Sequence, residues 1–181
     1  MATVYIFHGY GGNPAGNWFP WLKKELEKVG HTVHVPAFPN PDSPDLSAWL
    51  NFFESHAARI DEATVFVGHS LGSAFAMRYL EKADEPIQAT FLTAPVFGVM
   101  GNEIDAKIRS FNIEPFDFTA IARNGGEIHV IHSDNDPYIP LSQAENGAIE
   151  LLTPMDLITG GGHFMTPEFP ELRDMILTSV I

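Results

Sequence analysis

The sequence predicts a three-layer α/β/α fold with a mainly parallel sheet of about six strands. Short apolar, β-branched runs alternate along the chain with longer amphipathic segments. Most apolar runs end at glycine, proline or polar residues, as buried strands do. The length of 181 residues suits a single domain over 1–181 and leaves little room for another. Right-handed crossovers then place helices on both faces of the sheet.

Six apolar runs are expected to form the strands. The first run ends at Gly9, and Pro36 closes the second, so both have a clear stop signal. Ligands bind such sheets beyond the carboxyl ends of the strands, so the segments after each run are the ones to search. The expected strands are residues 3–8, 31–35, 64–67, 89–93, 127–132 and 155–158.

Helical periodicity occupies the segments between these runs. Asn17 is expected to cap the first helix and Gly30 to end it, while Pro167 suits the first turn of the last helix. Residues 102–111 show the least regular helical pattern. The expected helices are residues 18–29, 46–60, 71–82, 102–111, 141–151 and 167 to the C-terminus.

Composition narrows the classes of partner and cofactor. The formal net charge of −13 and the lack of a basic cluster argue against nucleic acid and anionic membranes as partners. The chain has no cysteine, which excludes disulfides and thiolate chemistry, and no histidine-rich spacing indicates a metal, so no cofactor is expected. The N-terminus lacks the pattern of a signal peptide, and no apolar run approaches the roughly 18 residues of a membrane span. A cytoplasmic location is expected, and the oligomeric state is left open.

The strongest chemical signal is Gly-x-Ser-x-Gly at residues 68–72. It lies between a predicted strand and a predicted helix, the context in which this motif forms a sharp turn called a nucleophile elbow. The glycines allow neighbouring backbone to approach, and the turn lifts Ser70 above the edge of the sheet. Ser70 is therefore the predicted nucleophile of a serine hydrolase with the α/β-hydrolase fold.

A serine hydroxyl needs a base, and His163 is the best of the eight histidines. It follows the last predicted strand in a glycine-rich turn, residues 160–164, that can present an imidazole above the sheet. In this fold the acid lies between the serine and the histidine along the chain. Asp136 follows the fifth predicted strand and precedes Pro137, which favours an extended backbone. Asp134 is the alternative acid and could instead shape the turn.

Acyl transfer also needs N–H donors for the developing oxyanion. One is expected from Leu71, immediately after the nucleophile. The other is expected from Tyr10, in the glycine-containing loop at residues 8–12 after the first strand. His8 is expected to orient this loop through a hydrogen bond and not to act as the base.

These motifs together resemble the small serine hydrolases related to retinoblastoma-binding protein 9, including the bacterial YdeN-like proteins. The resemblance rests on residues 8–12, 68–72, 136–140 and 162–164, in order and after the expected strands. It implies a compact α/β-hydrolase without a large cap domain, and a catalytic triad of Ser70, Asp136 and His163. The mammalian member is linked to a Leu-x-Cys-x-Glu partner motif. Since this chain has no cysteine, that binding role is not implied here.

The expected activity is cleavage of small acyl esters through an acyl-enzyme intermediate. Residues 102–119 leave no room for a cap domain, so an open site with an apolar rim is expected. A thioesterase, amidase or acyltransferase on the same triad is an alternative, and a non-catalytic protein-binding module is another. The residues expected to contact substrate are Trp18, Phe97, Tyr138 and Phe164, with Tyr10, Met100 and Met165 at the same rim.

Overall fold

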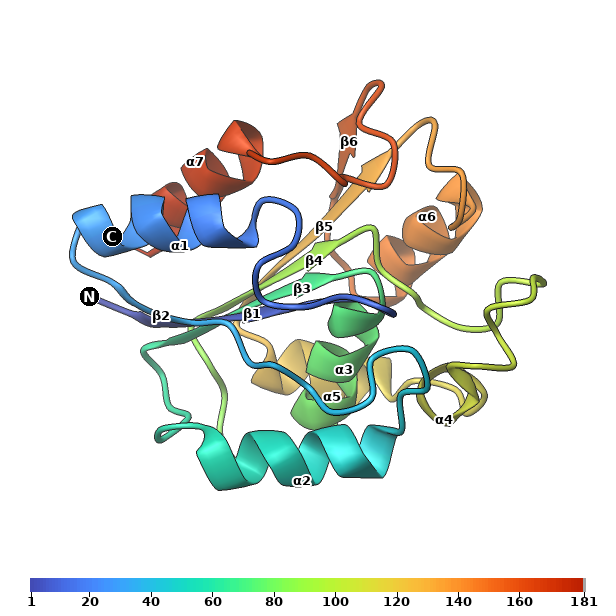
Figure 1. Cartoon of the computed structure of the whole chain (residues 1–181), viewed down its shortest axis with the longest axis horizontal. Helices are drawn as coiled ribbons and strands as arrows, with labels where there is room; N and C mark the ends of the chain where they lie inside the picture. Colours follow the sequence, from blue (N-terminus) through green and yellow to red (C-terminus); the bar gives the residue numbers. More distant parts are fainter. Residues whose placement is uncertain (181) are drawn as a thin grey trace.

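A computed structural model of the chain describes residues 1–180, which form a twisted sheet with helices on both sides (Figure 1). The sheet was predicted to be mainly parallel, and all six strands are parallel, with bounds within two residues of those expected. The strands are β1 (Thr3–Phe7), β2 (Thr32–His34), β3 (Thr64–His69), β4 (Ala89–Thr93), β5 (Glu127–Ser133) and β6 (Met155–Ile158). Their order in the sheet is β2-β1-β3-β4-β5-β6.

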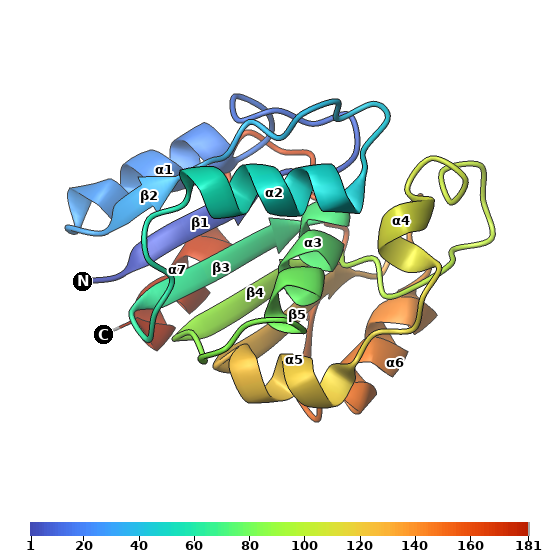
Figure 2. The ribbon, with the colours of Figure 1, turned by 90° about the horizontal axis from the view of Figure 1, so that it is seen from below.

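Seven helices surround this sheet in the described part of the chain. They are α1 (Phe19–Lys28), α2 (Leu46–His56), α3 (Leu71–Leu80), α4 (Arg109–Asn112), α5 (Phe118–Asn124), α6 (Leu141–Glu150) and α7 (Pro170–Ser179). Helices α1 and α7 cover one face, and Figure 2 shows α2, α3 and α5 on the opposite face. The predicted three-layer architecture is confirmed.

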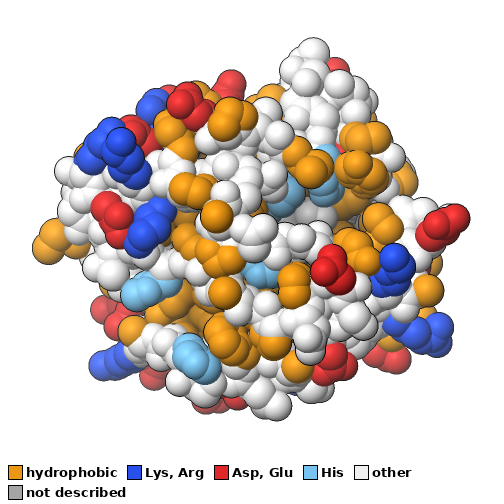
Figure 3. Space-filling view, in the orientation of Figure 1, with side chains coloured by type: hydrophobic (Ala, Val, Ile, Leu, Met, Phe, Trp, Pro, Cys, Tyr) orange, Lys and Arg blue, Asp and Glu red, His pale blue; other side chains and the backbone are white. Residues whose placement is uncertain are grey.

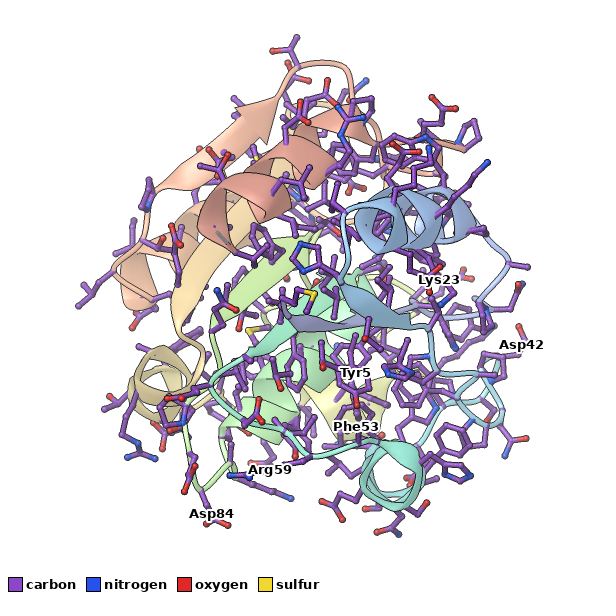
Figure 4. All side chains as sticks on the ribbon, turned by 90° about the vertical axis from the view of Figure 1, so that its left-hand side faces the viewer. Tyr5, Lys23, Asp42, Phe53, Arg59 and Asp84 are labelled. Atoms are coloured by element: carbon purple, nitrogen blue, oxygen red, sulfur yellow. The ribbon has the colours of Figure 1, made fainter. Side chains whose placement is uncertain are left out.

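The core between the sheet and α2 is built largely of aromatic rings. Phe53 of α2 meets Tyr5 and Phe7 edge-on, with ring centroids 5.1 and 5.2 Å apart, and Figure 4 shows Tyr5 and Phe53 pointing toward each other. Every residue of β3 is buried. Because truncating a buried aromatic side chain costs about 3–5 kcal/mol, this packing contributes strongly to the stability of β1 and β3, from whose ends the site is built.

Two predictions about helix ends are wrong. Asn17 does not cap α1: it has a positive φ of 49°, and Trp18 occupies the cap position without a side-chain hydrogen bond. The last helix begins at Pro170 and not at Pro167. The buried rings of Phe164 and Phe169 stack 4.7 Å apart, which holds the intervening chain in an irregular loop.

The segment after β4 also departs from its predicted helix. Of residues 102–111, only the turn from Arg109 onward is helical. The Asp105 carboxylate accepts hydrogen bonds from the backbone N–H groups of Met100, Gly101 and Asn102, which favours a turn over a helix at this point. The unpredicted α5 begins where Asp117 accepts a hydrogen bond from the N–H of Ala120. Helix α2 ends early because the Ala58 N–H donates to the Tyr5 hydroxyl.

No helix among residues 1–180 combines the length and the apolar character that a membrane crossing needs. Within the same residues, no three or more side chains of the metal-ligating types gather as a possible ion site.

Candidate active site

Ser70 occupies the sharp turn between β3 and α3 with φ 55° and ψ −119°. A non-glycine residue in the positive-φ region costs about 1–3 kcal/mol, so the surrounding packing must impose this conformation. A Cβ atom at Gly68 would lie 2.5 Å from the Ser73 Cα, and one at Gly72 would lie 2.1 Å from the Phe7 carbonyl oxygen. Both positions therefore require glycine, as expected for a nucleophile elbow.

The loop after β1 lies directly beside Ser70. A Cβ atom at Gly9 would be 3.0 Å from the Ser70 Cβ. Among the described residues, neither the Leu71 N–H nor the Tyr10 N–H has a hydrogen-bond acceptor, and both residues line the cavity at Ser70. Ser70 also marks the N-terminus of α3, where the helix dipole favours negative charge. Two unpartnered donors beside a hydroxyl can receive an oxyanion.

His8 orients this loop in the way predicted. Its Nδ1 lies 2.9 Å from the Gly9 carbonyl oxygen, to which it can donate, and its Nε2 accepts from the Phe38 N–H at 3.3 Å. Burial lowers the pKa of His8, which favours the neutral ring that can make both bonds.

His163 and Asp136 form a buried pair. The distance from His163 Nδ1 to Asp136 Oδ2 is 2.7 Å, and the two side chains are 10% and 1% exposed. The other carboxylate oxygen accepts from the N–H groups of Tyr138 and Ile139. Burial opposes ionisation of Asp136, but the hydrogen bond from His163 and those from the two amides outweigh it, so its pKa lies below the ordinary value. An ionised Asp136 thus holds the proton on Nδ1 and leaves Nε2 free.

Asp134, the alternative acid, makes a different contact. Its carboxylate accepts the Gly160 N–H at 2.8 Å, in the loop that carries His163. Asn135 likewise accepts the Gly162 N–H at 2.7 Å. Sequence reasoning missed Asn135, because no periodicity or motif indicates which polar residue of this turn faces a loop 27 positions later. Asp134 shapes the turn, and Asp136 is the carboxylate that meets the histidine.

A cavity of about 390 Å³ opens beside Ser70 and His163. Its lining is largely apolar and also includes several glycines, Asn13 and Asn17. Figure 3 shows hydrophobic and histidine side chains gathered near the upper right of this face of the molecule. Of the predicted rim residues, Tyr10, Met100, Tyr138 and Met165 line the cavity. We use the term apolar wall for six of its apolar lining residues, Val96, Met100, Ile104, Ile108, Tyr138 and Ile139.

Trp18, Phe97 and Phe164 were predicted to contact substrate, but they do not line this cavity, and these predictions are corrected. Trp18 is fully buried, with its ring 4.6 Å from that of Phe19. Phe164 is buried in the stacked ring pair described above. Phe97 packs on α6, where its ring fills the space that a side chain at position 147 would occupy. Each ring contributes to helix packing, which sequence alone does not distinguish from a place at the rim.

Three buried histidines make the fold sensitive to acid. Burial lowers the pKa values of His8, His69 and His132, that of His69 to about 3 from an ordinary 6.5. The unfolded chain therefore binds more protons between pH 6.5 and 3, so stability is full above pH 6.5 and declines below it.

We expect the free energy of unfolding to fall by roughly 2 kcal/mol between pH 7.5 and pH 5 through His69 alone. Urea denaturation at the two pH values measures this change. The variant His69→Phe should show a smaller pH dependence than the wild type. An equal dependence in the two proteins contradicts the prediction.

Comparison with known proteins finds relatives over most of the chain. The sequence model of the serine hydrolase family matches residues 4–168. The Bacillus subtilis protein YdeN is 30% identical over 165 residues, which cover 91% of this chain and 87% of that protein. The Rattus norvegicus serine hydrolase RBBP9 is 31% identical over 172 residues, 94% of this chain and 90% of that protein.

Solved structures share the fold. The crystal structure of the B. subtilis ydeN gene product matches with a TM-score of 0.93 and 27% identity, covering 99% of this chain and 98% of the other. Esterase PE8 matches with a TM-score of 0.68 at 16% identity, over 99% and 93% of the two chains, which shows the fold alone. The predicted α/β-hydrolase fold, without a large cap, is confirmed. The chain belongs to the serine hydrolase family, to which the YdeN and RBBP9 resemblance pointed.

Proposed function

We propose that this protein hydrolyses small acyl esters through a triad of Ser70, His163 and Asp136. The observation that carries the proposal is the His163–Asp136 hydrogen bond of 2.7 Å at the cavity where Ser70 sits in a strained elbow. This arrangement supplies a nucleophile, a base and an orienting acid on three separate loops. Family membership and an esterase with the same fold support the reaction class.

The proposed reaction is a double displacement. Ser70 Oγ attacks the acyl carbonyl carbon as His163 Nε2 takes the hydroxyl proton, and the carbonyl oxygen becomes an oxyanion that accepts from the Leu71 and Tyr10 N–H groups. The tetrahedral intermediate collapses with loss of the alcohol oxygen, which receives the proton from His163. Water then attacks the acyl-enzyme in the same way, releasing the carboxylic acid and restoring Ser70. Each oxyanion donor lowers the activation free energy by about 3 kcal/mol in such sites.

The cavity argues for a small, uncharged acyl group. Ile104 and Ile108 lie on its apolar wall, and no lysine or arginine is among its lining residues. Because an unpaired carboxylate is costly to bury, an acidic substrate fits this wall poorly. The volume of about 390 Å³ matches the lower end of small-molecule sites, which favours short acyl chains.

A fluorophosphonate probe tests the nucleophile. We expect the wild type to be labelled at Ser70 alone, and Ser70→Ala to lose both labelling and on the order of 10⁴-fold or more in ester hydrolysis. Mass spectrometry of the labelled peptide and rates on p-nitrophenyl esters of rising chain length measure these outcomes. Equal labelling of Ser70→Ala, or an unlabelled wild type, contradicts the proposal. Faster turnover of matched thioesters or amides identifies one of those substrate classes instead.

A further inference from the structure

The loop that carries His163 has little conformational restraint of its own. Gly160, Gly162 and Phe164 all have positive φ, at 74°, 57° and 51°. Glycine-rich segments lose much conformational entropy on ordering, so contacts from elsewhere must hold such a loop in one conformation. A base displaced by about 1 Å can cost a hundred-fold in rate.

Three polar side chains anchor this loop, and one differs from the other two. Asp134 and Asn135 hold the N–H groups of Gly160 and Gly162, both at the solvent-exposed side of the loop. His69 instead lies 2.8 Å from the carbonyl oxygen of His163 itself, with Nε2 as the donor. His69 is 3% exposed and is the last residue of β3, immediately before Ser70.

We propose that His69 is a positioning residue, whose Nε2–H holds the His163 carbonyl and so keeps the His163 ring in register with Ser70. The inference rests on the proposed function, since it assumes that His163 is the base. Fixing the carbonyl of a residue restrains the direction of its Cα–Cβ bond. Because the donor comes from the residue next to the nucleophile, one rigid segment positions both reacting side chains.

The surroundings of His69 suit this role. Trp18 and Phe19 meet its ring edge-on, each with centroids 5.9 Å apart, so the imidazole is held in one orientation. The His163 ring lies 4.9 Å away. A positive charge on His69 at this distance would disfavour the protonation of His163 during the reaction. Burial lowers the pKa of His69 to about 3, so its ring stays neutral while His163 takes the proton.

The contact can be tested with two substitutions and a matched control. His69→Phe keeps a planar ring but removes the donor, and fluorophosphonate labelling of Ser70 is expected to slow about ten- to hundred-fold. His69→Gln carries an amide nitrogen at the same number of bonds from Cα as Nε2, and it should recover most of the rate. His129→Phe removes an imidazole of β5 whose Nε2 contacts the Ser179 hydroxyl and not the His163 loop, and its labelling rate should stay near that of the wild type.

A spectroscopic measurement separates positioning from general loss of stability. The Nδ1 proton that His163 shares with Asp136 is expected to give a downfield NMR signal, which should shift or broaden in His69→Phe and return in His69→Gln. If His69→Phe does not fold, the labelling rate and the downfield NMR signal of His69→Gln are compared with those of the wild type instead. The inference is overturned if His69→Phe is labelled at the wild-type rate and its signal is unchanged. It is also overturned if His69→Gln is labelled slowly while its signal is unchanged. An unlabelled wild type overturns the proposed function instead.

Discussion

Asp136→Asn is expected to lower kcat for a p-nitrophenyl ester by roughly 10⁴-fold while leaving the fold intact. The asparagine oxygen can still accept from the Tyr138 and Ile139 N–H groups, so the turn keeps its shape. Its amide nitrogen, however, cannot accept the Nδ1 proton of His163, which then loses the tautomer that frees Nε2. Steady-state kinetics measure kcat, and circular dichroism checks the fold.

Asp134→Asn is the matched control for this substitution. Asp134 lies two positions away, and its one described contact at the site is the Gly160 N–H, which an asparagine oxygen can also accept. We expect a small change in kcat. A larger loss from Asp134→Asn than from Asp136→Asn would exchange the two assignments and refute the triad as proposed.

Gly72→Ala is expected to lower the free energy of unfolding by more than about 4 kcal/mol, a large part of the stability of an ordinary domain. The added Cβ would lie 2.1 Å from the Phe7 carbonyl oxygen and 2.8 Å from that of His8. Both are backbone atoms within or just after a buried strand, so they cannot move aside as a flexible side chain could. Soluble yield and thermal unfolding measure the effect.

Gly98→Ala is the control for this prediction. A Cβ atom at Gly98 would meet no atom within 4 Å, and its backbone does not require a positive φ. Its unfolding temperature should stay close to that of the wild type. A Gly72→Ala protein that unfolds at the same temperature as Gly98→Ala contradicts the close approach of α3 to β1.

The strands and the chemical motifs could be predicted because local signals determine them. Each strand is a short apolar run with a stop residue, and the elbow is specified by glycines whose positions follow from steric contact with Phe7 and Ser73. The position of Asp136 followed from chain order and from the proline after it. Such features need only a few neighbouring residues.

Features that depend on which partner a particular side chain contacts could not be predicted. The irregular segment after β4 is set by the Asp105 carboxylate, and the start of α7 by ring stacking between Phe164 and Phe169. The assignment of Trp18 to the rim failed for the same reason, since an aromatic residue near a loop can face either the core or a ligand. His69 gave no separate signal, because the residue before the serine can be of any type in the motif.

Three residues of the apolar wall lie in a different part of the chain from the proposed triad. Met100, Ile104 and Ile108 lie on the segment that Asp105 folds back on itself, outside every strand, whereas Ser70 follows a fully buried strand. Substitutions in that segment can reshape the pocket without disturbing the geometry of bond cleavage. Selection, or directed evolution, could therefore change which substrate is accepted while the catalytic geometry is retained.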